Sequence, residues 1–519
     1  MPLNLWIVRH TPITHVCNRN QAPFLTLCQA IGSRPLRTSA MKSLIIAAIS
    51  VLLSGCHETA RFRPSYNSTA ERSAPAAPDL KEFEGRYEYL NRASIQFAGS
   101  PRDGVLYAIL DEAKYPLKRM SEGVFADRDG SRVVFERGER GRVSGYRFYQ
   151  ERATNFFRRI SDAECPETMW FARRTPTNAP YQFTASIPPD LKDGLDVGSL
   201  QDAGLNIALI AKMVEQIANE THKNVDSVLL IKNGKLVLEE YFYQYDRDKL
   251  HQLRSATKSV VSALVGIALD KKLIASKEEN VIPFFPGYEI KNLSAEKRAI
   301  TVEHLLTCES GLACEDGNPA SPGEEQKMNA SSDWAQFVLD LPMVDPPGEI
   351  GRYCTGGVIL LGRIVEKASG KRLPDFAAEN LFGKLGITNY QWNFKPDSSS
   401  FDDACQLHMR PRDMAKLGLL YMNEGQWKGR QVLSREWVKA SLSKHSVVRG
   451  TDYGYLWWRQ WLNVDGTRVD GVTAKGNGGQ RIYLWPSLGL LVVITGASYN
   501  EQSPSDEIQV KYILPAAMR

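Results

Sequence analysis

The sequence predicts an α+β fold, in which an antiparallel sheet is flanked by helices and preceded by a small all-β domain. Residues 228–238 form two apolar runs around an Asn-Gly pair, which is typical of a β-hairpin. Apolar stretches with helical spacing follow at residues 255–269, 302–306, 357–369 and 412–422. Residues 480–484 and 490–495 then form a second apolar pair around Pro486-Ser487, so we expect an antiparallel hairpin to close the chain.

Length and composition exclude several classes of protein. The chain has 519 residues, of which 43% are hydrophobic and 24% charged, so it is neither a single small module nor a disordered or multi-span membrane protein. The net charge of +5 comes from residues 1–55, which carry five basic side chains and no acidic one. The rest of the chain is neutral, and nothing indicates the basic patch of a nucleic-acid-binding protein.

The first 79 residues have the pattern of a processed leader. Residues 41–55 combine Lys42, an apolar run from Leu44 to Leu53 and small residues, which is typical of a secretory signal peptide and too short to span a bilayer. The ending Leu53-Ser54-Gly55-Cys56 resembles the lipobox of bacterial lipoproteins, and this resemblance implies a lipid on Cys56. Residues 1–40 are then expected to be absent from the natural protein, because its start codon was assigned too early and translation begins at Met41. An organellar transit peptide, or a buried helix with an incidental cysteine, are the alternatives.

This leader predicts an exported protein that is lipid-anchored in the cell envelope and contacts a membrane through Cys56. His57 follows the lipidated residue, and by resemblance to Gram-negative lipoproteins this favours the periplasmic face of the outer membrane. Residues 56–79 are rich in Ser, Ala, Pro and Thr without apolar periodicity, so we expect a flexible tether.

Cysteine usage fits an exported protein but assigns no disulfide. Five cysteines remain once the leader is removed and Cys56 is lipidated, and an odd number leaves at least one free thiol. They are Cys165, Cys308, Cys314, Cys354 and Cys405. No CxxC pair or histidine cluster indicates a metal site.

Residues 80–180 are expected to form the small antiparallel β domain. Residues 133–137 and 143–148 flank a Gly-rich turn, residues 107–110 form another short strand, and helical periodicity is weak throughout. This domain is either a binding module or a cap over the active site. Residues 181–519 are expected to form the larger α+β domain.

The chemistry is predicted from Ser255 and Lys258, three residues apart at the start of an apolar helix. This spacing puts both side chains on one helical face, and burial of an amine lowers its pKa, so Lys258 can activate the Ser255 hydroxyl. The alternatives are a helix N-cap for Ser255 and a solvated amine for Lys258. Residues 294–297 and 441–444 repeat the spacing in polar surroundings, where we expect surface helical turns.

Two later motifs add to this pair. Tyr353-Cys354-Thr355 and residues 476–480, Gly-Asn-Gly-Gly-Gln, follow in that order. Together with Ser255 and Lys258 they resemble the three-motif set of the serine β-lactamase and penicillin-binding-protein superfamily. The order and spacing are most similar to the class C-like branch, which includes family VIII esterases and 6-aminohexanoate-dimer hydrolases. The resemblance extends from about residue 226 to the end and implies a β-lactamase/transpeptidase-like fold.

The resemblance also implies residue roles. Ser255 would attack a carbonyl group, with Lys258 and Tyr353 as proton-transfer groups and the backbone N–H groups of Ser255 and Gln480 as the oxyanion hole. Substrate-binding positions would be Thr355, Asn477, Gly478 and Gly479. The resemblance implies no metal and no organic cofactor.

Two departures bear on the substrate. Thr355 stands where related enzymes usually have Asn, and Asn477 stands where they have Lys or His. A neutral Asn477 binds a substrate carboxylate more weakly than a cation does, unless Lys475 compensates. The sequence therefore predicts a serine hydrolase for an ester or amide in a small-molecule or peptide-like acyl substrate. A β-lactamase or D-alanyl-D-alanine carboxypeptidase, or a non-catalytic envelope binding protein, are the alternatives.

Two less specific features complete the prediction. Trp457, Trp458 and Trp461 either line an acyl pocket or belong to the core. The insert at residues 315–329 has loop-like composition and either borders the cleft or is plain surface.

Overall fold

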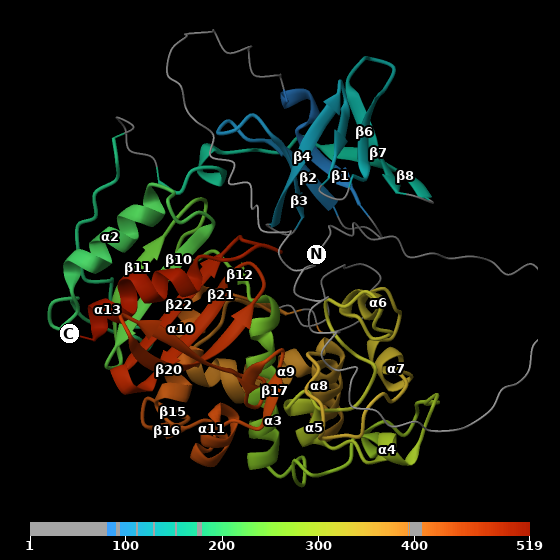
Figure 1. Cartoon of the computed structure of the whole chain (residues 1–519), viewed down its shortest axis with the longest axis vertical. Helices are drawn as coiled ribbons and strands as arrows, with labels where there is room; N and C mark the ends of the chain where they lie inside the picture. Colours follow the sequence, from blue (N-terminus) through green and yellow to red (C-terminus); the bar gives the residue numbers. More distant parts are fainter. Residues whose placement is uncertain are drawn as a thin grey trace, which may run out of the picture. The chain divides into compact units, whose positions relative to one another are not determined.

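The computed structural model describes residues 80–89, 94–110, 113–127, 130–150, 153–173, 179–392, 394 and 407–518 (Figure 1). The expected leader, signal peptide and tether lie outside these residues, as do Cys56 and Cys405. Among the helices of the described segments, none combines the length and the apolar character needed to cross a membrane.

The N-terminal part is a closed barrel of eight antiparallel strands, β1 to β8. Each strand pairs with the next, and β8 pairs back with β1. The strands are β1 (Gly85–Glu88), β2 (Ser94–Gly99), β3 (Leu106–Leu110), β4 (Ala113–Ser121), β5 (Val124–Ala126), β6 (Arg132–Arg137), β7 (Val143–Gln150) and β8 (Ala153–Ser161). The expected all-β character is confirmed, and β3, β6 and β7 match the strands predicted from sequence.

Aromatic rings fill the barrel interior. The Tyr87 ring lies 5.2 Å from Phe97, 5.8 Å from Phe135 and 5.6 Å from Tyr146, each in an edge-to-face arrangement between ring centroids. Such pairs add to the free energy of burial because ring edges and faces carry opposite partial charges. The barrel therefore has a hydrophobic core of its own.

The larger part is built on a nine-stranded sheet with the strand order β17-β18-β19-β20-β21-β22-β10-β11-β9. All neighbours are antiparallel except β9, which runs parallel to β11. The strands are β9 (Asp196–Val197), β10 (Val225–Lys232), β11 (Lys235–Tyr241), β17 (Ser446–Val448), β18 (Thr451–Tyr453), β19 (Trp458–Val464), β20 (Thr467–Gly476), β21 (Gln480–Trp485) and β22 (Leu490–Gly496).

Both hairpins predicted from sequence are present. β10 and β11 are joined by Asn233 and Gly234, whose φ angles of 49° and 82° are those of a tight hairpin turn. β21 and β22 pair around the short turn at residues 486–488. The two hairpins are adjacent, because β22 also pairs with β10.

Helices cover both faces of this sheet. Alternate residues of β10 face opposite cores: Leu229 and Ile231 pack with the larger helical layer, and Val228 and Leu230 pack with the other. The helices are α2 (Ile207–Ala218), α3 (Thr257–Asp270), α4 (Ala295–Arg298), α5 (Val302–Leu306), α6 (Glu325–Asn329), α7 (Trp334–Leu339), α8 (Thr355–Ser369), α9 (Leu373–Ala377), α10 (Pro411–Met422), α11 (Arg435–Leu442), α12 (Ser505–Ile508) and α13 (Leu514–Ala517). The α+β prediction is confirmed.

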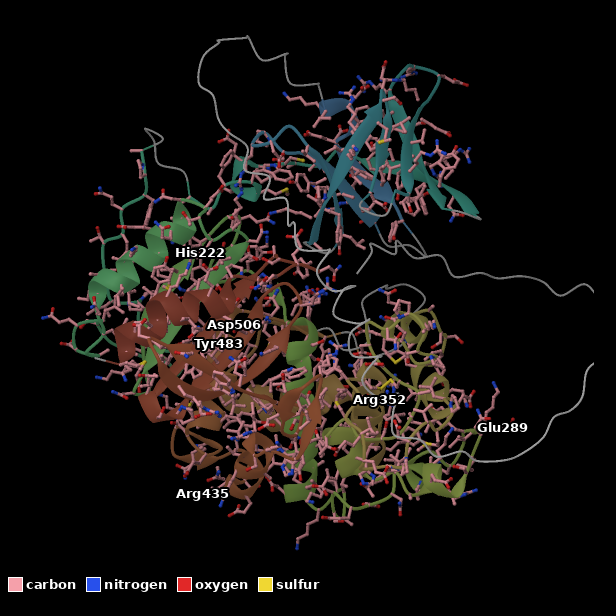
Figure 2. All side chains as sticks on the ribbon, in the orientation of Figure 1. His222, Glu289, Arg352, Arg435, Tyr483 and Asp506 are labelled. Carbon is pink, nitrogen blue, oxygen red and sulfur yellow. A yellow bond between two sulfur atoms is a disulfide. The ribbon has the colours of Figure 1, made fainter. Side chains whose placement is uncertain are left out.

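Polar contacts also join the smaller helical layer, which contains α2, α12 and α13, to the sheet. Tyr483 of β21 donates a hydrogen bond to Asp506 of α12 at 2.6 Å (Figure 2). His222, after α2, lies 3.3 Å from the Tyr512 hydroxyl near the C-terminus. These contacts supplement the apolar packing of α2 and α13 against β10 and β22.

The central helix α3 differs slightly from its prediction. It begins at Thr257, and Ser255 lies in a single 3-10 turn, Arg254–Ala256, that leads into it. Twelve consecutive residues of α3, from Thr257 to Ala268, are buried. A helix buried all round needs no amphipathic pattern, which agrees with its almost wholly apolar sequence.

Residues 294–297 form the predicted helical turn, in which Ala295 and Glu296 are exposed, but the predicted surface position of Lys297 was wrong. Ser294 caps α4, but Lys297 is only 1% exposed. Its Nζ donates to the backbone carbonyls of Lys291, Leu339 and Leu341 at 2.9, 2.8 and 2.6 Å. In the other repeat of the spacing, Ser441 is buried within α11, and the exposed Lys444 pairs with Asp452 at 2.7 Å.

Candidate active site

Ser255 and Lys258 face each other as their spacing predicts. The Nζ atom of Lys258 lies 3.0 Å from Ser255 Oγ, and the lysine is 2% exposed. Arg254, directly before Ser255, has a φ of 51°, in the left-handed region that non-glycine residues rarely adopt. This turn brings the Ser255 hydroxyl to the start of α3.

Tyr353 joins this pair from the segment just before α8. It is 7% exposed, and its ring centroid lies 5.0 Å from Lys258 Nζ. Burial raises the pKa of Tyr353 above its usual value, although the Lys258 charge and a hydrogen bond with Ser255 lower it. The phenol is therefore protonated at neutral pH.

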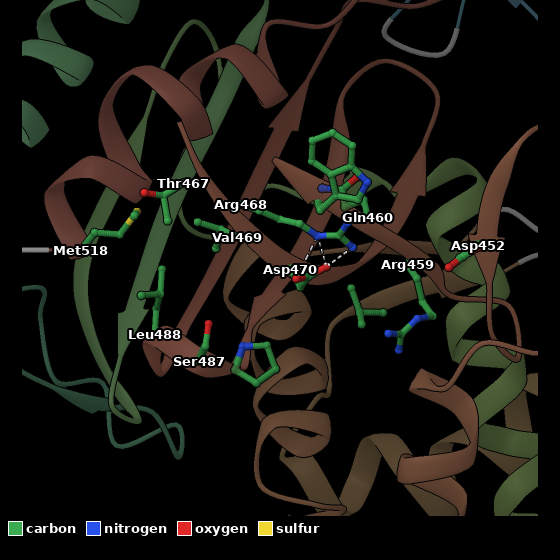
Figure 3. Close-up of a pocket in the computed structure, with 14 residues that line it drawn as sticks. Asp452, Arg459, Gln460, Thr467, Arg468, Val469, Asp470, Ser487, Leu488 and Met518 are labelled. Atoms are coloured by element: carbon green, nitrogen blue, oxygen red, sulfur yellow. Dashed lines mark hydrogen bonds and ion pairs between the residues drawn. The ribbon is translucent and has the colours of Figure 1, made fainter. Parts of the chain in front are cut away.

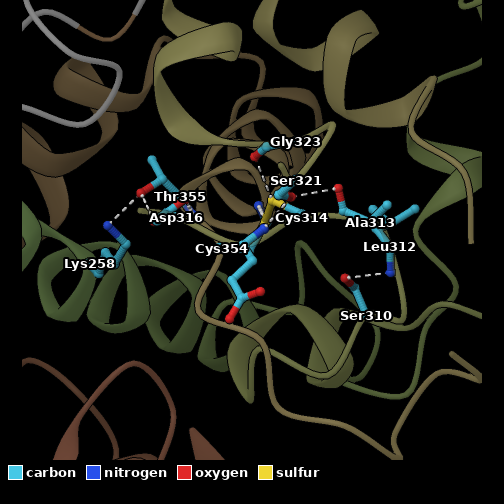
Figure 4. Close-up of a disulfide and its surroundings, with 12 residues drawn as sticks. Lys258, Ser310, Leu312, Ala313, Cys314, Asp316, Ser321, Gly323, Cys354 and Thr355 are labelled. Atoms are coloured by element: carbon cyan, nitrogen blue, oxygen red, sulfur yellow. Dashed lines mark hydrogen bonds between the residues drawn. A yellow bond between two sulfur atoms is a disulfide. The ribbon is translucent and has the colours of Figure 1, made fainter. Parts of the chain in front are cut away.

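Thr355 also contacts Lys258. Its Oγ1 is 2.8 Å from Lys258 Nζ and 2.7 Å from an oxygen of Asp316 (Figure 4). Both oxygens of Asp316 also accept from the backbone N–H of Thr355, at 3.1 and 2.9 Å. Thr355 was predicted to bind substrate, but its side chain is fully buried and its hydroxyl is occupied by these two partners.

A disulfide holds this region together. Cys314 and Cys354 are bonded, with their Cα atoms 5.5 Å apart (Figure 4). The bond links the loop that carries Asp316 to the residue between Tyr353 and Thr355. Cys165 and Cys308 have free thiols.

The third motif lies beside the turn that carries Ser255. A Cβ atom on Gly476, the last residue of β20, would be 2.2 Å from the Leu253 carbonyl oxygen and 3.1 Å from Arg254 Cβ. Only glycine allows this approach. Gly478 and Gly479 follow with φ angles of 91° and 105°, so the turn into β21 depends on them as well.

The polar side chains of this motif are occupied by protein partners. Asn477 binds Asn500 in both directions, donating to its side chain at 2.9 Å and accepting from its backbone at 3.0 Å. The Gln480 side chain is buried and donates to the Gly496 carbonyl at 2.6 Å. These contacts hold the turn that positions the backbone N–H group of Gln480, one of the two donors expected in the oxyanion hole.

Two basic residues lie around Tyr353. Arg449 is exposed, and its guanidinium carbon is 4.8 Å from the Tyr353 ring centroid. Lys475 is half-buried, with Nζ 5.9 Å from the Trp458 ring, which itself packs 5.3 Å from Tyr353. Burial lowers the pKa of Lys475. Arg449 therefore adds positive charge beside Tyr353, and Lys475 is separated from Tyr353 by the Trp458 ring.

The three tryptophans have different environments. Trp457 is buried in the core, Trp458 packs on Tyr353, and Trp461 is 54% exposed. Trp461 lines a pocket of about 530 Å³ together with the Arg468–Asp470 ion pair (Figure 3). The pocket is lined by none of the site residues predicted from sequence. Of these tryptophans, only Trp458 contacts the candidate site.

No metal site accompanies this arrangement in the described part of the chain, where no group of three or more His, Cys, Asp or Glu side chains is placed to hold an ion.

The beta-lactamase family model matches residues 210–512, a range that includes all three motifs. The chain belongs to the beta-lactamase family. A 6-aminohexanoate-dimer hydrolase of Paenarthrobacter ureafaciens is 24% identical over 301 residues, which cover 54% of this chain and 74% of that protein. A putative D-alanyl-D-alanine carboxypeptidase of Escherichia coli is 23% identical over 250 residues, covering 42% of this chain and 56% of that protein. Among solved structures, a putative beta-lactamase from Bacteroides dorei superposes with a TM-score of 0.49 at 18% identity, covering 61% of this chain and all of that one.

Within this beta-lactamase family chain, Asp316 and Arg449 were missed by sequence reasoning. Asp316 lies in the insert whose composition indicated only a loop, and Arg449 lies in the turn between β17 and β18. One signal was available for Asp316, because Cys354 is inside the second motif and any disulfide from it brings a distant loop there. Arg449 had no such signal.

Proposed function

We propose that this protein is a serine hydrolase that cleaves an ester or amide through a covalent acyl-enzyme on Ser255. The 3.0 Å approach of Lys258 Nζ to Ser255 Oγ, inside a buried site, carries the proposal. A serine hydroxyl is a weak nucleophile until a neighbouring base takes its proton, and Lys258 is placed to do so. Membership of the beta-lactamase family, together with the similarity to a 6-aminohexanoate-dimer hydrolase, supports the same reaction class.

The residues suggest an order of proton transfers. Lys258, in its neutral form, removes the Ser255 proton as Oγ attacks the carbonyl carbon. Negative charge on the carbonyl oxygen is stabilised by the backbone N–H groups of Ser255 and Gln480. Tyr353, protonated at neutral pH, donates its proton to the leaving oxygen or nitrogen as that bond breaks, and regains one from Lys258. Water then attacks the acyl ester and releases Ser255.

An activity-based probe tests this proposal. A soluble form that begins just after Cys56 is incubated with a fluorophosphonate, and its intact mass is measured beside a Ser255→Ala control. A single adduct on the wild type that is absent from the control is the expected result. Well-folded protein without an adduct would overturn the acyl-enzyme mechanism and leave a non-catalytic binding protein as the better proposal.

A beta-lactamase or D-alanyl-D-alanine carboxypeptidase activity is the second candidate. Both substrates carry a carboxylate, and Arg449 offers an exposed guanidinium beside Tyr353 where Asn477 is neutral. A cation binds a carboxylate through charge-assisted hydrogen bonds, which are about twice as strong as neutral ones. Parallel assays with a neutral ester, a cephalosporin and a D-Ala-D-Ala peptide would separate the two candidates.

We also propose an exported, lipid-anchored protein that contacts the envelope membrane through Cys56. The Leu53-Ser54-Gly55-Cys56 sequence supports this proposal. Membrane fractionation of the wild type beside Cys56→Ser tests it, because only the lipidated form should remain with the membrane.

A further inference from the structure

A buried carboxylate behind Lys258 takes no part in the reaction proposed above. Asp316 is 7% exposed, and both of its oxygens are bound by Thr355. Burying a carboxylate costs free energy unless its hydrogen bonds compensate. The position of this group beside the Lys258–Ser255 pair therefore calls for a functional explanation.

The direction of the hydrogen bonds provides one. An amine that accepts the Ser255 proton must turn its lone pair toward Ser255 Oγ and direct its own N–H groups elsewhere. Thr355 Oγ1, at 2.8 Å, accepts one of these N–H groups only if the threonine proton points away from Lys258. Asp316 accepts that proton at 2.7 Å and so fixes its direction.

This explains the unusual second motif. An asparagine carries a carbonyl oxygen that only accepts, so it can receive a lysine N–H without help. A threonine hydroxyl both donates and accepts, and it needs a second group to fix which it does toward Lys258. Thr355 and Asp316 together can therefore replace a single asparagine.

Three contacts hold Asp316 in place. Its backbone N–H donates to the Tyr353 carbonyl at 2.8 Å, and its own carbonyl accepts from Arg449. The Cys314–Cys354 disulfide joins its loop to the residue before Thr355. These contacts hold the loop in the position where Asp316 accepts the hydrogen bond from Thr355.

We propose that Asp316 is a positioning residue that acts through Thr355 to orient the Lys258 amine toward Ser255. The inference rests on the proposed function, because it assigns Asp316 a part in activating the same serine. Asp316 does not itself touch the reacting atoms.

The charges around Asp316 give this role a pH dependence. Burial, together with the nearby Glu325 charge, raises the pKa of Asp316 to about 7, although Lys258 and the Thr355 hydrogen bonds lower it. Below that pH the protonated carboxyl no longer fixes the Thr355 proton, so activity should fall on the acid side. The titratable or charged groups that face Asp316 are Lys258 of α3, Glu325 of α6, Tyr353, Tyr453, Cys308 and, at its backbone oxygen, Arg449.

Four variants test the proposal on an ester substrate. Asp316→Leu, which has no acceptor for the Thr355 proton, and Thr355→Val should each lower kcat by about 10- to 100-fold with little change in KM, because the amine is misoriented while the substrate contacts remain. Thr355→Ser keeps the hydroxyl and should restore most of the activity. Glu325→Gln removes a negative charge, so it should move the acid limb of the kcat profile to lower pH without changing kcat at pH 9.

Circular dichroism and melting temperatures show that each variant is folded. If Asp316→Leu keeps the wild-type kcat and pH profile, the proposal is overturned. If Asp316→Leu does not fold, Glu325→Gln decides alone, and an unmoved acid limb overturns the proposal.

A direct titration separates this inference from the proposed function. The ionisation of Asp316 is followed by its carboxyl infrared band, as the wild-type minus Asp316→Asn difference, with and without Lys258→Met. Removal of the Lys258 charge should raise the Asp316 titration midpoint. If the wild type does not react with the fluorophosphonate, the proposed function fails, but a raised midpoint still supports the interaction between Asp316 and Lys258. An unchanged midpoint overturns the role proposed for Asp316.

Discussion

At the scale of single residues, the candidate site depends on which protons are fixed and which can move. Thr355 and Asp316 hold one proton between them, and in the proposed mechanism a second proton moves among Ser255, Lys258 and Tyr353. Local spacing predicted the Ser255–Lys258 contact, because residues three apart share a helical face. It could not predict Asp316, which is 39 residues from Thr355 and meets it only through the tertiary fold.

Replacing Tyr353 by phenylalanine should lower kcat by about 100- to 10,000-fold, because the leaving group loses its proton donor. The ring would still pack on Trp458, so the melting temperature should change little. Steady-state kinetics and calorimetry measure both. Because burial raises the pKa of Tyr353, the wild type should also retain this donor up to at least pH 10. A Tyr353→Phe enzyme with normal kcat would exclude the phenol from proton transfer.

Arg449→Gln should raise KM for carboxylate-bearing substrates by about 10- to 100-fold, the equivalent of one charge-assisted hydrogen bond. A neutral ester of the same acyl group serves as the matched control, and its KM should be unchanged. Equal effects on both substrates would mean that Arg449 acts through Asp316, whose carbonyl it also binds, and not on the substrate.

Lys297→Met tests a buried lysine outside the site. The Lys297 ammonium donates hydrogen bonds to three backbone carbonyls. The substitution leaves these carbonyls without their charged donor, so it should lower the free energy of unfolding by about 2–3 kcal/mol. Urea denaturation measures the change, with Lys444→Met as an exposed control. A Lys297→Met protein as stable as that control would show that the carbonyls find other partners.

At the scale of elements, sequence patterns predicted what is locally encoded. The Asn233-Gly234 hairpin, the closing hairpin and helices α5, α8 and α10 were found within two residues of their observed ends. Lys297 was misjudged because its partners, Leu339 and Leu341, are over 40 residues away. The polar residues next to Lys297 in the sequence therefore could not predict that its side chain binds these distant carbonyls.

The disulfide between Cys314 and Cys354 should stabilise the loop–helix element that carries Asp316 and Thr355. It closes a 40-residue separation, and loops of this size correspond to about 2–4 kcal/mol of folding free energy. Cys314→Ser/Cys354→Ser should therefore lower the melting temperature, and it should also lower kcat by loosening Asp316. A stable double variant with reduced kcat would separate positioning from stability, and a normal kcat would show that hydrogen bonds alone hold the loop.

At the scale of the whole molecule, the barrel and the nine-stranded sheet have separate hydrophobic cores. Sequence reasoning predicted an all-β region but not a closed barrel, because closure depends on pairing between β1 and β8, the first and last strands. Such pairing leaves no local mark in either strand. Although contacts such as the Arg102–Glu220 ion pair at 2.8 Å join the two parts, we expect the barrel core to be able to lose its packing without exposing the core of the sheet.

Phe97→Ala should unfold the barrel at lower temperature and leave the serine site unchanged. Phe97 is 1% exposed and packs edge-on with Tyr87, Phe135 and Tyr146, so its removal should cost about 3–5 kcal/mol. Scanning calorimetry should show one transition shifted downward and a second unmoved, with the same rate of fluorophosphonate labelling at Ser255. A single transition that shifts as a whole would instead mean that the two cores unfold together, and a slower labelling rate would support the barrel as a cap on the active site.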